Sequence, residues 1–186
     1  MGVRVDFLAR GFEDYTFSFF VVSAAPKAVV ESALAGVVAS THIFGTELHY
    51  DGHTGEVASI KRVPAGYGKV AVLDELEHRL GIAPDRMIYI GDGSSDVHVM
   101  LHVNSRDGFT IAVSENRQLA GIARRTVLSD NAFSVLVPIL DQLMHWRASE
   151  IRALFESNGL LLDEWEQART DRVHVTAASL PARAIA

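Results

Sequence analysis

Hydrophobic and polar positions follow two kinds of pattern along this chain. Nearly continuous apolar runs, typical of strands buried on both faces of a parallel sheet, occupy 17–22, 87–90, 108–114 and a shorter 125–130. Between them, apolar residues recur at helical spacing. The helices predicted in this way span 26–38, 68–82 and 132–144. Asp130 or Asn131 is expected to cap the last of these helices.

Strands that alternate with helices predict an α/β fold with a doubly wound, Rossmann-like parallel sheet. Over 42–63, polar and apolar residues alternate around Asp51-Gly52, which predicts a small β-hairpin as an excursion at the edge of the fold. The composition then changes after about residue 145. We therefore expect a core over 1–144 and a helical extension with a flexible tail over 145–186.

Composition restricts the classes of function. The 186 residues are 48% hydrophobic, carry a formal net charge of -6 and include no cysteine, which excludes thiolate catalysis and cysteine-ligated metals. Scattered basic residues give no stripe for nucleic acid. The apolar stretch at 16–26 has the length of a signal-peptide core, but Asp6, Glu13 and Asp14 precede it. We interpret it as a buried strand, and we expect a cytoplasmic protein without a membrane partner.

The stretch "MIYIGDGSSDVHVM" places Asp92 and Asp96 directly after an apolar run. The two carboxylates are one turn apart if a helix begins near Ser94, so both can face one point beyond the strand. Mg²⁺ takes one or two carboxylates, with waters and phosphate oxygens completing its shell. The alternative is an ordinary loop in which Asp96 caps a helix.

Two further polar side chains stand where a doubly wound sheet opens to solvent. Ser23 follows the first apolar run, and Lys69 lies at the start of a predicted helix. A hydroxyl, an ammonium and a carboxylate pair together suit a transferring phosphoryl group. Each signal has an alternative, because Ser23 also fits a helix cap and Lys69 a solvated first-turn lysine.

With these motifs in view, the chain resembles the haloacid dehalogenase superfamily, and in particular its phosphoserine-phosphatase-like branch, over roughly residues 16–130. The motifs that carry the resemblance are "FFVVSAAP", "GYGKVAVL" and "YIGDGSSDVHVM", with "HIFGTELHYDGHTGEV" as the hairpin of that branch.

The resemblance implies Mg²⁺-dependent hydrolysis of a small phosphorylated metabolite through an aspartyl-phosphate. Ser23, Ala24 and Lys69 are then implied to bind the phosphate, Ser23 and Lys69 to act in catalysis, and Asp92 and Asp96 to hold Mg²⁺.

One element of the family pattern is missing, because no Asp-x-Asp motif occurs in these 186 residues. The family's nucleophile is the first aspartate of that motif. Asp6 ends a short β-like run, but Leu8 stands where the general acid belongs. Either preceding residues belong to the functional gene product, or this is a degenerate member that serves binding or assembly, or another chain supplies the strand.

The same gap affects the fold, since the first strand of this family lies in the middle of the sheet. We therefore expect an inactive or impaired hydrolase whose exposed strand edges favour a homodimer or strand exchange.

Overall fold

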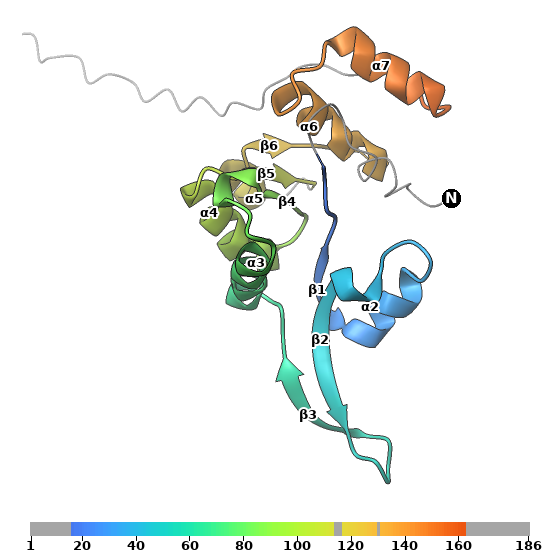
Figure 1. The fold of residues 1–186 in the computed structure, drawn as a ribbon, viewed down its shortest axis with the longest axis vertical. Helices are drawn as coiled ribbons and strands as arrows, with labels where there is room; N and C mark the ends of the chain where they lie inside the picture. Colours follow the sequence, from blue (N-terminus) through green and yellow to red (C-terminus); the bar gives the residue numbers. More distant parts are fainter. Residues whose placement is uncertain (1–15, 114–116, 130, 163–186) are drawn as a thin grey trace, which may run out of the picture.

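The computed structural model describes residues 16–113, 117–129 and 131–162 (Figure 1). These residues form the α/β architecture that the pattern predicts, but their strands fall into two three-stranded sheets, with orders β1-β2-β3 and β4-β5-β6. The strands are β1 (Val21–Pro26), β2 (Ile43–Tyr50), β3 (Val57–Arg62), β4 (Ile88–Gly91), β5 (Phe109–Ala112) and β6 (Arg125–Thr126).

Helices occur in all three predicted segments, although the first ends at Ala33 and not at residue 38, and further helices occur outside these segments. The helices are α2 (Lys27–Ala33), α3 (Tyr67–Leu80), α4 (Val97–Ser105), α5 (Arg117–Ile122), α6 (Leu136–Gln142) and α7 (Ala148–Ser157), with 3₁₀ turns η1 (Ser40–His42), η2 (Pro84–Arg86), η3 (Ser94–Asp96) and η4 (Ala132–Val135). Asn131 caps η4 by accepting a hydrogen bond from the Phe133 amide at 2.9 Å; Asp130 lies outside the described residues. Across the described ranges, no helix combines the length and apolar character that crossing a membrane requires.

The second sheet is doubly wound and holds nearly all of the core. Its three strands are parallel, with Ile90 opposite Ile111 and Ile111 opposite Arg125. One face packs on α6 and α7, where Phe109 and Ile111 meet side chains that include Ile151. The other face packs on α3, α4 and α5. The helix after residue 145 thus contributes to the same core, and residues 163–186 lie outside the described part.

The first sheet has a different character. β1 pairs in parallel with β2, and β2 pairs antiparallel with β3, which confirms the predicted hairpin. β1 begins at Val21, so Ser23 lies inside the strand instead of after it. Among the described residues before β4, the helix α2 has no buried side chain, and Ile43 is the one buried apolar residue of β1, α2, β2 and β3. Figure 1 shows the hairpin extending away from the other elements.

Aromatic and charged contacts join the first sheet to α3. The guanidinium of Arg79 lies 6.0 Å from the Phe20 ring centroid and 5.6 Å from that of Phe44. Arg62 of β3 forms an ion pair with Glu75 of α3 at 2.8 Å. Such contacts contribute less than a buried apolar interface, so the first sheet is held more weakly than the second.

This difference predicts uneven hydrogen exchange. Backbone amides of β1, β2 and β3 should exchange faster than those of β4 and β5, because few buried apolar contacts oppose their opening. Arg79→Ala should accelerate exchange in the first sheet alone. Mass spectrometry of exchanged peptides measures both effects, and equal protection of the two sheets would contradict this view of the fold.

Each sheet has open edges within the described part of the chain, and two of these edges belong to β1 and β4. β1 is hydrogen-bonded to β2, and β4 to β5, but no strand within the described part of the chain pairs with the other edge of either. Open edges favour pairing with another chain. We therefore expect the mass measured by light scattering to rise with protein concentration.

An edge variant makes this expectation specific. Ile90 lies on β4 and is 37% exposed, whereas Leu101 lies on helix α4 and is 50% exposed. Ile90→Lys should reduce association by placing a charge on the open strand, and Leu101→Lys should leave it unchanged. A monomer at all workable concentrations would remove the prediction.

Candidate active site

Lys69 lies in the first turn of α3. The backbone of Val63 packs closely against the start of this helix at Gly68. A Cβ on Gly68 would lie 2.1 Å from the carbonyl oxygen of Val63, so only glycine fits there. Lys69 follows directly and is 6% exposed. The alternative of a solvated first-turn lysine is therefore wrong, and the ammonium group is held inside the protein.

Asp96 is the partner of Lys69 and the centre of a hydrogen-bond network. Its Oδ1 accepts hydrogen bonds from the Lys69 ammonium and from the Tyr89 hydroxyl, the latter at 2.6 Å. Its Oδ2 accepts from the amides of Asp92 at 3.1 Å and Gly93 at 3.0 Å. The residue is 2% exposed. Asp96 thus ties α3, β4 and the loop after β4 together.

The electrostatics of this network favour an ionised carboxylate. Burial by itself raises the pKa of Asp96, but the hydrogen bonds from Lys69, Tyr89 and the Gly93 amide outweigh burial and hold the pKa below its ordinary value. Burial, with the adjacent Asp96 carboxylate, also raises the pKa of Tyr89 far above its ordinary value. Tyr89 is therefore a neutral donor to a charged acceptor.

Gly91 makes this placement of Asp96 possible. A Cβ at position 91 would lie 2.6 Å from the Asp96 carboxyl carbon, which no ordinary side chain tolerates. At position 91, the close neighbour in the structure is the protein's own carboxylate.

Asp92 differs from Asp96 in its surroundings. Asp92 is exposed at the end of β4, whereas Asp96 is turned inward. Lys69, Tyr89 and two loop amides hold the Asp96 carboxylate, and the expectation that both carboxylates face one ion stays a prediction. Nowhere in the described ranges do three histidine or acidic side chains gather as a metal-binding group.

Ser23 and Ala24 belong to the first sheet. The Ser23 hydroxyl accepts a hydrogen bond from the Ala25 amide at 3.2 Å, and the Ala24 carbonyl accepts one from the Thr46 hydroxyl at 2.6 Å. Ser23 does not cap α2, whose N-cap is Pro26. Within the described chain, no hydrogen bond joins Ser23 or Ala24 to the Lys69–Asp96 pair. The structure brings Lys69, Asp92 and Asp96 together, and leaves Ser23 on a separate sheet.

A family comparison agrees with this arrangement. The model of a family described as haloacid dehalogenase-like hydrolase matches residues 6–101, which is 96 of the 186 residues. The chain belongs to the haloacid dehalogenase-like hydrolase family. In this haloacid dehalogenase-like hydrolase, the matched range contains Ser23, Ala24, Lys69, Asp92 and Asp96. A search of curated proteins finds no match.

Asp6 and Asp14 of this haloacid dehalogenase-like hydrolase lie outside the described residues. The structure therefore does not test whether Asp6, which the sequence disfavours because Leu8 stands at the position of the general acid, acts as a nucleophile.

Tyr89 is the site residue of the hydrolase that sequence reasoning missed. In "MIYI", a tyrosine within an apolar run indicates only a buried strand position. The signal that was present is chemical, because a buried tyrosine hydroxyl needs a hydrogen-bond partner. Asp96 follows seven residues later on the same strand–loop segment and supplies that partner.

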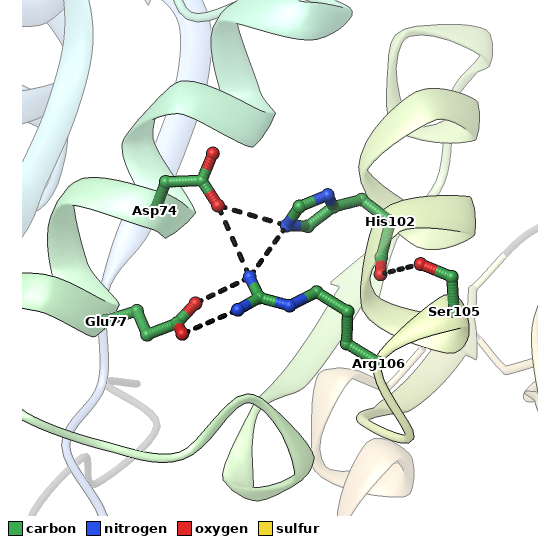
Figure 2. Close-up of polar contacts among 5 residues, drawn as sticks. All are labelled: Asp74, Glu77, His102, Ser105 and Arg106. Atoms are coloured by element: carbon green, nitrogen blue, oxygen red, sulfur yellow. Dashed lines mark hydrogen bonds and ion pairs between the residues drawn. The ribbon is translucent and has the colours of Figure 1, made fainter.

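Helices α3 and α4 of the hydrolase lie side by side with their amino-terminal ends together. The Tyr67 and His98 rings stack at 4.3 Å beside the Lys69–Asp96 pair. Further along both helices, Arg106 forms two hydrogen bonds of 2.7 Å with Glu77, and His102 lies 3.1 Å from Asp74 (Figure 2).

These contacts account for both histidines on α4. His98 and His102 are four positions apart on one helix, which is a spacing that metal ligands also have. One is stacked on a tyrosine and the other belongs to the charged cluster.

Proposed function

We propose that this chain forms the phosphate-binding and metal-binding part of a Mg²⁺-dependent phosphatase of the phosphoserine-phosphatase-like branch. Its substrate would be a small phosphorylated metabolite, hydrolysed through an aspartyl-phosphate. The observation that carries the proposal is the buried Lys69–Asp96 pair at the end of β4, because a protein retains a buried ammonium group only when it is paired, and here its partner belongs to the matched loop.

Lys69 suits a phosphate ligand on chemical grounds. An ammonium has three donors, and among the described residues Asp96 accepts one of them. We assign the other two donors to phosphoryl oxygens. The Ser23 hydroxyl is half-buried and carries a hydrogen atom that no described group accepts, so it adds a donor if the first sheet closes on α3. In the family mechanism these groups stabilise charge that develops on the transferring phosphoryl group.

The donor set fits Mg²⁺ with one protein carboxylate. Asp92 is exposed and free to bind an ion, whereas both oxygens of Asp96 already accept two hydrogen bonds each. Mg²⁺ is commonly held by one or two carboxylates together with substrate phosphate oxygens and waters. We therefore assign direct metal binding to Asp92, with Asp96 orienting the loop that carries it. A bound Mg²⁺ would neutralise charge on the phosphate.

The Mg²⁺ site has a direct test. Addition of Mg²⁺ should shift the NMR signals of amides 91–94 in the wild-type chain, and Asp92→Asn should abolish the shifts by removing the ligand charge. Asp85→Asn is a matched control, since Asp85 is an exposed carboxylate at the opposite end of β4. Equal or absent responses in all three proteins would remove the metal site.

A non-catalytic role is the alternative, and the absence of Asp-x-Asp from these residues favours it. In that case the site binds an anion or metal during assembly and does not turn over a substrate. The sequence of the genome immediately upstream of the Met1 codon separates the two proposals. An in-frame Asp-x-Asp supports the enzyme, whereas a stop codon supports the binding protein.

A further inference from the structure

Tyr89 combines a core position with a polar contact at the site. It lies in the middle of β4, is 9% exposed and packs with Leu73, Val99 and Met100. Its hydroxyl reaches out of this apolar cluster to Asp96 Oδ1 at 2.6 Å. A phenylalanine would fill the same apolar space, so the hydroxyl serves the contact with Asp96 and not the packing.

The hydroxyl shares its acceptor with the lysine. Oδ1 of Asp96 accepts from both Tyr89 and Lys69, while Oδ2 accepts from two loop amides. Two donors on one oxygen each bind less strongly than one donor alone. Tyr89 thus fixes the direction of the carboxylate oxygen that pairs with the ammonium group.

We propose that Tyr89 is the positioning residue of Lys69. By donating to Oδ1, it fixes the direction of the carboxylate and, through it, the place of the ammonium group and of its remaining N–H donors. Without the hydroxyl, the carboxylate and the ammonium group shift together, and the ammonium group binds an anion less well. The positioning role rests on the contacts above, and its consequence for anion binding rests on the proposed function.

The chain offers a clear spectroscopic test, because it has three lysines, Lys27, Lys61 and Lys69. The side chains of the first two are 34% and 76% exposed, and that of Lys69 is 8% exposed. In ¹⁵N-lysine-labelled protein, Lys27→Arg and Lys61→Arg assign the exposed signals and leave the Lys69 ammonium signal identified.

Tyr89→Phe should displace the Lys69 ammonium signal. Ile111→Val is the control, since it removes one methyl group from the neighbouring strand, on the other face of the same sheet, without touching Asp96. A displaced signal in Tyr89→Phe alone supports the positioning role. An unchanged signal, or the same displacement in Ile111→Val, overturns it, because a purely structural loss would affect both variants alike.

Sulfate binding then separates this inference from the proposed function. Sulfate keeps its double charge over the working pH range, so it probes the protein groups alone. Tyr89→Phe should bind it about two- to tenfold more weakly than Ile111→Val does, which is the range of one hydrogen bond. Equal sulfate affinity would overturn the link between Tyr89 and the anion. If the Lys69 signal moves but even the wild type binds no sulfate, the proposed function fails and the positioning role stands.

Discussion

The 186-residue chain should hydrolyse p-nitrophenyl phosphate at or near the uncatalysed rate, even with Mg²⁺ present. In the proposed site, Lys69, Ser23 and a metal would stabilise charge that develops only when a nucleophile attacks phosphorus. In enzymes that use covalent catalysis, loss of the nucleophile costs about 10⁴- to 10⁶-fold in rate. Vanadate or tungstate should still bind weakly, because binding does not need the nucleophile. Release of p-nitrophenol and anion titrations measure the two properties separately.

The same prediction can be tested in the opposite direction by adding the missing motif. An amino-terminal strand carrying Asp-x-Asp should restore hydrolysis, since the open edges of β1 and β4 leave a place for it. The matched control is the same strand with Asn-x-Asp, which supplies the backbone without the nucleophile. Equal activity of the two grafts would contradict the mechanism. Robust hydrolysis by the unmodified chain, abolished in Asp6→Asn, would instead identify Asp6 as the nucleophile.

Lys69→Met should lower the free energy of unfolding by about 3–5 kcal/mol, the usual cost of leaving one member of a buried ion pair without its partner. The side chains of Lys69 and Asp96 are 8% and 3% exposed, so solvent does little to compensate. Methionine keeps most of the volume of lysine and isolates the loss of charge. Urea unfolding followed by circular dichroism measures the difference.

The double variant Lys69→Met/Asp96→Asn should recover part of this loss. It removes the unpaired charge, and the asparagine oxygen still accepts hydrogen bonds from the Asp92 and Gly93 amides. A double variant as unstable as Lys69→Met would show that packing, and not charge, causes the destabilisation.

Acid should act on the same pair. Because the pKa of Asp96 is lowered on folding, its contribution is fully present above the unfolded-state value near pH 4 and is lost as the pH falls through the folded-state value. When the pH falls below about 4, the free energy of unfolding of the wild type should therefore decrease more than that of the double variant.

Local pattern was sufficient for the elements of the fold. α3 was predictable because Leu73 and Leu76 recur on one face and Gly81 ends the helix in a left-handed conformation. The hairpin was predictable from its alternation around Asp51, whose carboxylate accepts hydrogen bonds from the His53 and Thr54 amides. These features depend on residues close together in the chain.

The site was only partly predictable, because its geometry depends on distant contacts. The spacing of Asp92 and Asp96 is correct for a shared ion, but the orientation of Asp96 is decided by Lys69, 27 positions earlier, and by the space above Gly91. The division into two sheets was also not visible, since the runs at 17–22 and 87–90 are both largely apolar, although β1 has no buried residue in the structure. Which strands pair with one another depends on contacts between residues that are far apart in the chain.

The side-by-side arrangement of α3 and α4 has a consequence for the charge at the site. Each helix start contributes about half a positive charge through its aligned peptide dipoles. Lys69 and Asp96 cancel each other, and the exposed carboxylate of Asp92 offsets the two helix starts, so the local charge is close to zero. A divalent cation on Asp92 would make the site positive, and a dianion beside Lys69 would make it negative. Cation and anion should therefore each bind more tightly when the other is present, by the same factor.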